Sequence, residues 1–95
     1  MAAIGVLTLE LEFLEAQSLK DKRHWVRGLK DRLRNGFNLA VAEIDDHNLW
    51  NRSVVAAVTI SSSRENAAKT LDAAERVAAD FLGPALLSAT VDWLE

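Results

Sequence analysis

Apolar and polar side chains alternate along residues 6–13, and a strict period of two is typical of a half-buried β-strand. The alternation returns at residues 86–93. Two further runs rich in β-forming residues lie at 37–44 and 54–60, on either side of the polar turn 45–48. The pattern therefore predicts four strands, with the middle two joined as an antiparallel hairpin. The positions expected to face the core from the first and last strands are Leu7, Leu9, Leu11, Phe13, Leu87, Ala89, Val91 and Trp93.

A helical period of about 3.6 residues governs the two segments between these strands. Ser18 is a suitable N-cap for the first helix, with Asp21 three residues later, and the pattern continues to Arg34 before Asn35-Gly36 ends it. One face of this helix is apolar, so it must cover another part of the molecule. That face contains Leu19, Trp25, Val26, Leu29 and Leu33.

Ser61-Ser62-Ser63 supplies N-caps for the second helix, with Ser62 and Glu65 as a capping box, and the helix is predicted to end before Gly83-Pro84. Its apolar positions repeat at spacings of four and three, which indicates a single buried face. Those positions are Ala67, Leu71, Ala74, Ala78 and Phe81.

The resulting order, strand, helix, strand, strand, helix, strand, predicts a ferredoxin-like βαββαβ sandwich of the α+β class. Right-handed crossovers place both helices on one face of a four-stranded antiparallel sheet. A chain of 95 residues has room for one hydrophobic core, so we expect residues 1–95 to form a single domain. The opposite sheet face is expected to be polar and acidic, with Thr8, Glu10, Glu12, Ser88, Thr90 and Asp92.

Five short segments resemble the YlxP-like family of small bacterial proteins, a ferredoxin-like domain of unknown function. They are Ser18-Leu19-Lys20-Asp21-Lys22-Arg23, Leu29-Lys30-Asp31-Arg32-Leu33, Phe37-Asn38, Val41-Ala42-Glu43 and Leu49-Trp50. The resemblance implies a ferredoxin-like fold, a tendency to form homodimers, and genes that often lie among those for translation initiation and ribosome maturation factors. It implies no agreed activity and supplies no catalytic residues.

Charge is distributed unevenly along the chain. Residues 18–36 contain seven Lys or Arg and two Asp, a net charge of +5, so the remainder carries −8 within the total of −3. Five of the cations fall inside an arc of roughly 80° on the first helix. These candidate nucleic-acid-binding residues are Lys20, Arg23, Arg27, Lys30 and Arg34.

Two interpretations of this basic stripe remain open at the level of sequence. Lys and Arg side chains on one helix edge can bind phosphates of RNA without reading the bases. The same pattern also occurs on the solvated face of an ordinary amphipathic helix, where Asp21 and Asp31 offset part of the charge. We expect a non-enzymatic accessory protein that contacts RNA or a ribosomal subunit, and the alternative is a homodimeric module that binds an acidic protein partner.

The expected sheet face does not suit base stacking, because RNA readers of the RRM type place aromatic side chains there. Thr8, Glu10 and Thr90 occupy those positions instead. The same face, with the edge strands beside it, is a candidate surface for homodimer formation.

The turn Asp45-Asp46-His47-Asn48 gathers polar groups that could bind a cation or transfer a proton, but such residues are chiefly those that reverse a hairpin. His24 is interpreted as a polar surface position. Trp25, Trp50 and Trp93 are interpreted first as core or rim residues and only second as interface anchors.

Several function classes find no support in the sequence. Residues 15–18 contain neither the glycine nor the arginine that a phosphate-cradling loop requires at this place in the fold. The chain has no cysteine, which excludes disulfides and thiolate metal sites. We therefore expect no catalytic residues, metal site, cofactor or small-molecule substrate. No apolar run reaches the roughly 20 residues of a membrane span, and the expected location is the cytoplasm.

Overall fold

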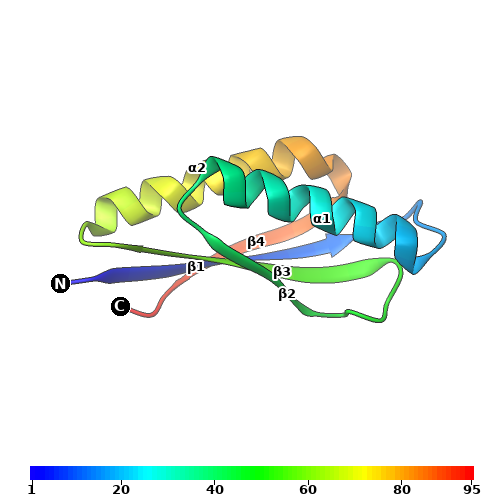
Figure 1. The fold of residues 1–95 in the computed structure, drawn as a ribbon, viewed down its shortest axis with the longest axis horizontal. Coiled ribbons are helices and arrows are strands. Elements are labelled where there is room, and N and C mark those ends of the chain that lie inside the picture. The colour runs from blue at the N-terminus through cyan, green and yellow to red at the C-terminus, as the bar shows by residue number, and fades with distance from the viewer.

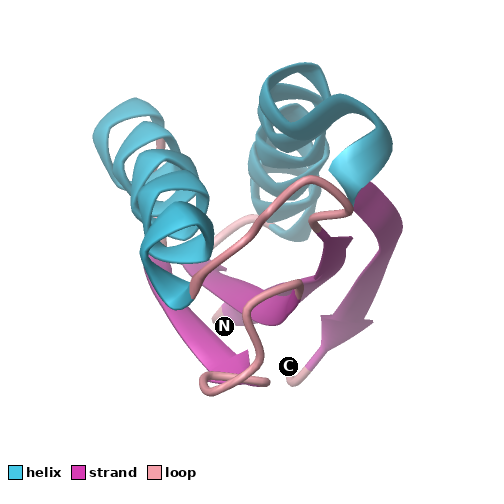
Figure 2. Cartoon of the chain, turned by 90° about the vertical axis from the view of Figure 1, so that its right-hand side faces the viewer, coloured by secondary structure: helices cyan, strands magenta, loops and turns pink.

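A computed structural model describes the whole chain, residues 1–95, and contains four strands and two long helices (Figure 1). The strands pair antiparallel in the order β2-β3-β1-β4, and both helices cover one face of the sheet (Figure 2). This arrangement confirms the predicted ferredoxin-like sandwich. The elements are β1 (Ala3–Glu12), α1 (Leu19–Gly36), β2 (Ala40–Asp45), β3 (Arg52–Ser61), α2 (Arg64–Leu82), a short 3-10 turn (Gly83–Ala85) and β4 (Leu86–Trp93).

The helix ends differ slightly from those predicted. Ser18 caps α1 as expected, its Oγ accepting from the Asp21 N–H at 3.2 Å. The helix then continues through Gly36, because the Phe37 N–H still donates to the Leu33 carbonyl. Strand β2 consequently begins at Ala40, three residues later than predicted. The cap of α2 is Ser63, whose Oγ accepts from the Asn66 N–H, so the predicted pairing of Ser62 with Glu65 was wrong.

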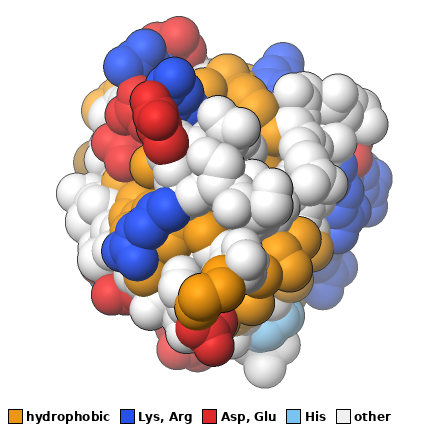
Figure 3. Space-filling view, turned by 90° about the vertical axis from the view of Figure 1, so that its left-hand side faces the viewer, with side chains coloured by type: hydrophobic (Ala, Val, Ile, Leu, Met, Phe, Trp, Pro, Cys, Tyr) orange, Lys and Arg blue, Asp and Glu red, His pale blue; other side chains and the backbone are white.

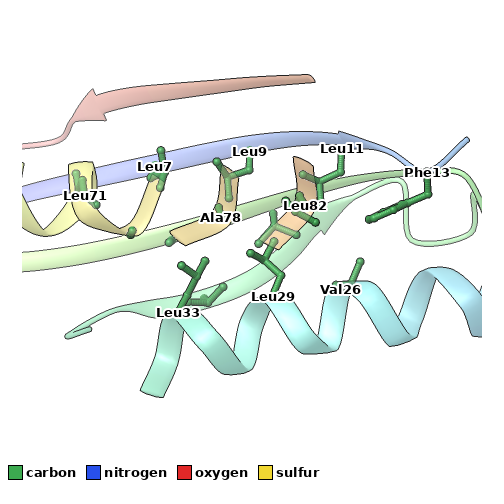
Figure 4. Close-up of a cluster of buried hydrophobic side chains, with 14 residues drawn as sticks. Leu7, Leu9, Leu11, Phe13, Val26, Leu29, Leu33, Leu71, Ala78 and Leu82 are labelled. Carbon is green, nitrogen blue, oxygen red and sulfur yellow. The ribbon is translucent and has the colours of Figure 1, made fainter. Parts of the chain in front are cut away.

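The core lies between the sheet and the helices (Figure 4). Strand β1 supplies Leu7, Leu9 and Leu11, all fully buried as the alternation predicted. Burial of such side chains contributes about 1.5–3 kcal/mol each. The other core residues from β1 and the helices include Phe13, Val26, Leu29, Leu33, Leu71, Ala74, Ala78 and Leu82.

Strand β4 departs from the predicted alternation near its start. The pairing of β1 with β4 shifts between Glu10 and Leu11, so that Leu86 lies opposite Leu11. Leu86 therefore packs against the core, whereas Leu87 is 48% exposed. Leu87 is the extra residue of this bulge, since Leu11 pairs with Leu86 and Glu10 with Ser88. The predicted alternation therefore begins only at Ala89, and the prediction for Leu87 was wrong.

Lys22 is the unexpected member of the interior, with a side chain only 1% exposed. Its Nζ lies 3.2 Å from a carboxylate oxygen of Glu43 on β2. The same ammonium group donates to the backbone carbonyls of Asp46 at 2.7 Å, His47 at 3.1 Å and Arg52 at 3.1 Å. A buried ammonium group is tolerated only when its charge is compensated and its protons are bonded.

We call this arrangement the Lys22 clamp: the Lys22 ammonium, the Glu43 carboxylate, and the carbonyls of Asp46, His47 and Arg52. The acceptors belong to β2, to the following turn and to the first residue of β3, so one side chain of α1 holds the whole hairpin connection. The Ser53 hydroxyl also donates to the Glu43 carboxylate. The clamp fixes α1 against the hairpin independently of apolar packing.

Replacing Lys22 with methionine is expected to lower the free energy of unfolding by about 3–5 kcal/mol, because it removes the positive charge beside the Glu43 carboxylate and one hydrogen bond from each of three carbonyls. Chemical denaturation of wild type and Lys22→Met measures this difference. The matched control is Lys69→Met, since Lys69 pairs with Glu65 on the exposed surface of α2. Removal of that pair should change stability by no more than about 0.5 kcal/mol. Equal effects of the two substitutions would show that the clamp adds nothing to stability.

Candidate functional site

The structure places the five predicted cations on one side of α1, which we call the basic edge: Lys20, Arg23, Arg27, Lys30 and Arg34. Four of them are exposed and Lys30 is half-buried. The basic edge faces away from α2. Arg34 at its end donates to the Val41 carbonyl of β2 at 2.7 Å, whereas Arg32, on the other side of the helix, lies over the Phe81 ring of α2 at 3.8 Å.

No carboxylate neutralises the basic edge by direct contact, since none of its five residues forms an ion pair within 4.0 Å. Helix α2 differs in this respect. There Lys69 pairs with Glu65 at 3.4 Å and Arg76 pairs with Asp72 at 2.6 Å. Figure 3 shows the contrast, with blue side chains gathered along the right-hand edge, where α1 lies, and blue and red mixed over α2. The geometry thus concentrates positive charge on one side of the molecule.

The two acidic residues of α1 form no ion pair with the basic edge. Asp21 belongs to the first turn, where its carboxylate accepts from the Gln17 N–H at 3.0 Å, and this bond helps to cap the helix. Asp31 is exposed and forms no ion pair. Asp21 and Asp31 lower the net charge of α1, but neither contacts a cation of the basic edge.

The turn Asp45–Asn48 serves to reverse the hairpin. Asp46 has a positive φ of 61°, a conformation that Asp adopts more readily than most residues. An Asp45 carboxylate oxygen accepts from the Asp46 N–H at 2.8 Å, and the Leu49 N–H donates to the Asp46 carbonyl. The carbonyls of Asp46 and His47 point to Lys22, as described above. The turn therefore uses its backbone to bind a cation that belongs to the chain itself.

The three tryptophans occupy rim positions. Trp93 is half-buried and packs against the core, with Arg64 4.3 Å above its ring. Trp25 is 41% exposed and lies between Phe13 and Phe81, at centroid distances of 6.4 Å and 5.2 Å. Trp50, beside the hairpin turn, is 49% exposed. His24 is an exposed residue next to Trp25, which agrees with its interpretation as a surface position.

The sheet face that the helices leave open is polar only in part, which corrects the prediction of an acidic face. Over β1 and β4 it carries the predicted Glu10, Ser88 and Thr90, and the Ser88 hydroxyl donates to Glu10 at 2.8 Å. Over β2, β3 and the first half of β1 the face is apolar. We call this region the apolar band; it comprises Ile4, Val6, Ala40, Ala42, Val54, Ala56, Val58 and Ile60.

The apolar band follows from the composition of β3, whose residues are apolar on both sides of the strand. Val55 and Ala57 are fully buried in the core, while Val54 and Val58 point to the other face. Ile60 is 57% exposed at the end of the strand. Figure 3, which looks onto one end of the molecule, shows orange side chains gathered at the lower side of the view. The signal in the sequence was the unbroken apolar run at residues 54–58, which lacks the alternation of a strand with one solvated face.

Neither helix of the structure is both long and apolar enough to cross a lipid bilayer.

Comparison with solved structures supports the fold. The protein At3g17210 from Arabidopsis thaliana superposes with a TM-score of 0.55 at 19% sequence identity, covering 97% of this chain and 93% of the plant protein. This likeness extends to the fold alone.

Comparison of sequences identifies the relatives. The chain is 34% identical over 68 residues to the uncharacterized protein YlxP of Bacillus subtilis (strain 168), an alignment that covers 72% of this chain and 74% of YlxP. The model of a protein family of unknown function, DUF503, matches residues 4–91. The chain therefore belongs to the DUF503 family and is a YlxP-like protein.

Proposed function

We propose that this protein is a non-enzymatic accessory protein of the cytoplasm that contacts RNA, on the ribosome or during its maturation, through the basic edge. The observation that carries the proposal is the set of five cations on one side of α1, none paired with a carboxylate. The resemblance to YlxP-like proteins implies that the gene lies among genes for translation and ribosome maturation factors. This gene neighbourhood supports a ribosomal target.

The basic edge would bind the phosphate backbone and not the bases. From Lys20 to Arg34 an α-helix rises about 21 Å, enough to lie along several phosphates. Contacts of this kind depend on counterion release, so they weaken steeply as salt is added. The open sheet face contributes little, because the apolar band has no aromatic side chain on which a base could stack. Recognition then depends on the shape and charge of the RNA.

Co-sedimentation with purified ribosomal subunits in sucrose gradients tests the proposal. We expect wild type to migrate with one subunit at low salt and to dissociate at high salt. The double variant Arg23→Glu, Arg27→Glu should lose this binding, because it replaces two phosphate contacts with repulsion. Lys30 is left unchanged since it is half-buried.

The matched control reverses Lys69 and Arg76 of α2, which changes the net charge by the same amount at residues already paired with carboxylates. This control should bind as wild type does. Equal binding by both double variants, or no binding by wild type at low salt, would contradict the proposal that the basic edge binds ribosomal RNA.

A second candidate function is a homodimeric interaction module that presents its basic edge to an acidic protein. The apolar band favours it, because contiguous exposed apolar surface commonly marks an interface. A second copy fits the band, because an apolar surface can pack against the same surface of another molecule across a two-fold axis. Glu10 and Asp92, which border the band on β1 and β4, would repel their counterparts, so the contact between two copies would be confined to the band. Nuclease treatment of a pull-down separates the two functions, since it releases partners bound through RNA and retains acidic proteins.

Multi-angle light scattering tests the dimer. We expect wild type to be dimeric at tens of micromolar and Val58→Lys to be monomeric, because Val58 lies within the apolar band and a buried unpaired ammonium is costly. The control is Thr90→Lys, which adds the same charge on the polar half of the same face. That variant should remain dimeric. A monomeric wild type would contradict this candidate.

A further inference from the structure

A pocket of about 480 Å³ opens at the end of the molecule where β1 leads into α1. Three segments form its walls: the loop after β1, the first turns of α1, and the connection from α2 to β4. Figure 2 looks onto this end of the molecule. The apolar lining includes Phe13, Trp25, Leu82 and Pro84. Because Trp25 packs towards Phe81 of α2, the pocket lies on the other side of α1 from the basic edge.

The charge of the lining is negative. Glu12, Glu15 and Asp21 are among the eleven residues that form it, His24 is its one basic side chain, and no Lys or Arg belongs to it. The Glu12 carboxylate lies 3.2 Å from Arg52, so its charge is partly compensated, while Glu15 forms no ion pair. An apolar pocket lined by carboxylates favours a ligand that is itself apolar and positively charged.

Trp25 supplies a second feature that points to a cation. Arg32 covers Phe81 at 3.8 Å and Arg64 covers Trp93 at 4.3 Å, so two aromatic rings at the surface already hold a cation of the chain. Trp25 is 41% exposed in the pocket and no Lys or Arg lies over its ring. Indole is the best of the aromatic side chains for binding a cation.

The N-terminus of α1, which borders the pocket, does not offset this preference by attracting anions. The N–H group of Asp21 in its first turn already donates to the Ser18 hydroxyl. The Asp21 carboxylate accepts from the Gln17 N–H and places a negative charge at the same end of the helix. The Asp21 charge therefore offsets the positive end of the helix dipole at the pocket.

We propose that this pocket binds an organic cation with an apolar body, that is, an alkyl or aryl group ending in an ammonium or guanidinium group. The apolar body would pack against Phe13, Leu82 and Pro84, and the cation would lie between the Trp25 ring and the carboxylates of Glu15 and Asp21. Free amines and the Lys or Arg side chains of a partner peptide share this chemistry. The site goes beyond the proposed function and does not require the basic edge.

The test is a titration followed by two-dimensional ¹H–¹⁵N NMR of the full chain with three matched probes. 2-Phenylethylamine is cationic, 2-phenylethanol is neutral and phenylacetate is anionic, while the apolar body is nearly the same. We expect the amine to shift the Trp25 indole N–H and the amides of Glu15 and Asp21, the alcohol to bind more weakly, and phenylacetate not to bind.

A second arm compares the peptides N-acetyl-Lys-Phe-Lys-amide and N-acetyl-Glu-Phe-Glu-amide. Tighter binding of the Lys peptide than of the free amine would support a partner segment as the natural ligand, and the reverse would support a free amine. Equal affinity for the three small probes would overturn the proposal. So would the absence of shifts at the pocket with both the amine and the Lys peptide.

Three double variants test whether the preference for a cationic ligand arises from carboxylates of the pocket. Glu15→Gln combined with Asp21→Asn preserves the shape of the lining and should weaken amine binding about three- to tenfold, the range expected for two exposed charge contacts. Asp31→Asn combined with Glu75→Gln makes the same change of charge outside the lining and should leave affinity unaltered. The Arg23→Glu, Arg27→Glu variant should also bind the amine as wild type does. Equal weakening by the two variants that remove carboxylates would show a general charge effect and contradict a specific site. Tighter amine binding by the Arg23→Glu, Arg27→Glu variant, which makes the protein more negative, would lead to the same conclusion.

Discussion

The buried ammonium of Lys22 is the constraint on which the surfaces of this protein depend. Apolar contacts between α1 and the sheet are not directional, and they alone would permit the helix to rotate or slide by a fraction of a turn. The Lys22 clamp is directional, because it joins one atom of α1 to a carboxylate and three carbonyls of the hairpin. It thereby determines which side of α1 faces outwards and which faces α2.

Two chemically opposite surfaces result from that orientation. On the side of α1 beyond β2 the basic edge collects cations without carboxylate partners. On the side towards α2, the first turns of the same helix contribute Asp21 and Trp25 to a pocket lined by acidic and apolar residues. A net charge of −3 conceals this polarity. A single helix, held at one angle, separates a surface suited to phosphates from a pocket suited to organic cations.

The sequence predicted the fold because the alternation in β1 and the spacing of apolar residues in both helices are strong periodic signals. The clamp was missed because Lys22 was grouped with the other cations of α1. The position of Lys22 in the sequence did indicate burial, since it shares one helical face with Val26, Leu29 and Leu33. A lysine on a buried helical face needs an acceptor inside the protein. Which partner it finds depends on the hairpin, and that is a contact between distant parts of the chain. The bulge beside Leu11 likewise depends on the pairing of two strands that are distant in the sequence.

The spacing of the five cations was enough to predict that they lie on one side of α1. It could not reveal that one of them, Arg34, also forms a hydrogen bond with the backbone of another element. Arg34 donates to the Val41 carbonyl of β2, a strand with no neighbour on its outer side. Strands at the margin of a sheet can recruit strands of other chains, and natural proteins guard them with charged side chains. Arg34 occupies part of the backbone that such a recruit would need. The cation that ends the basic edge thus also protects the protein from uncontrolled association along its sheet.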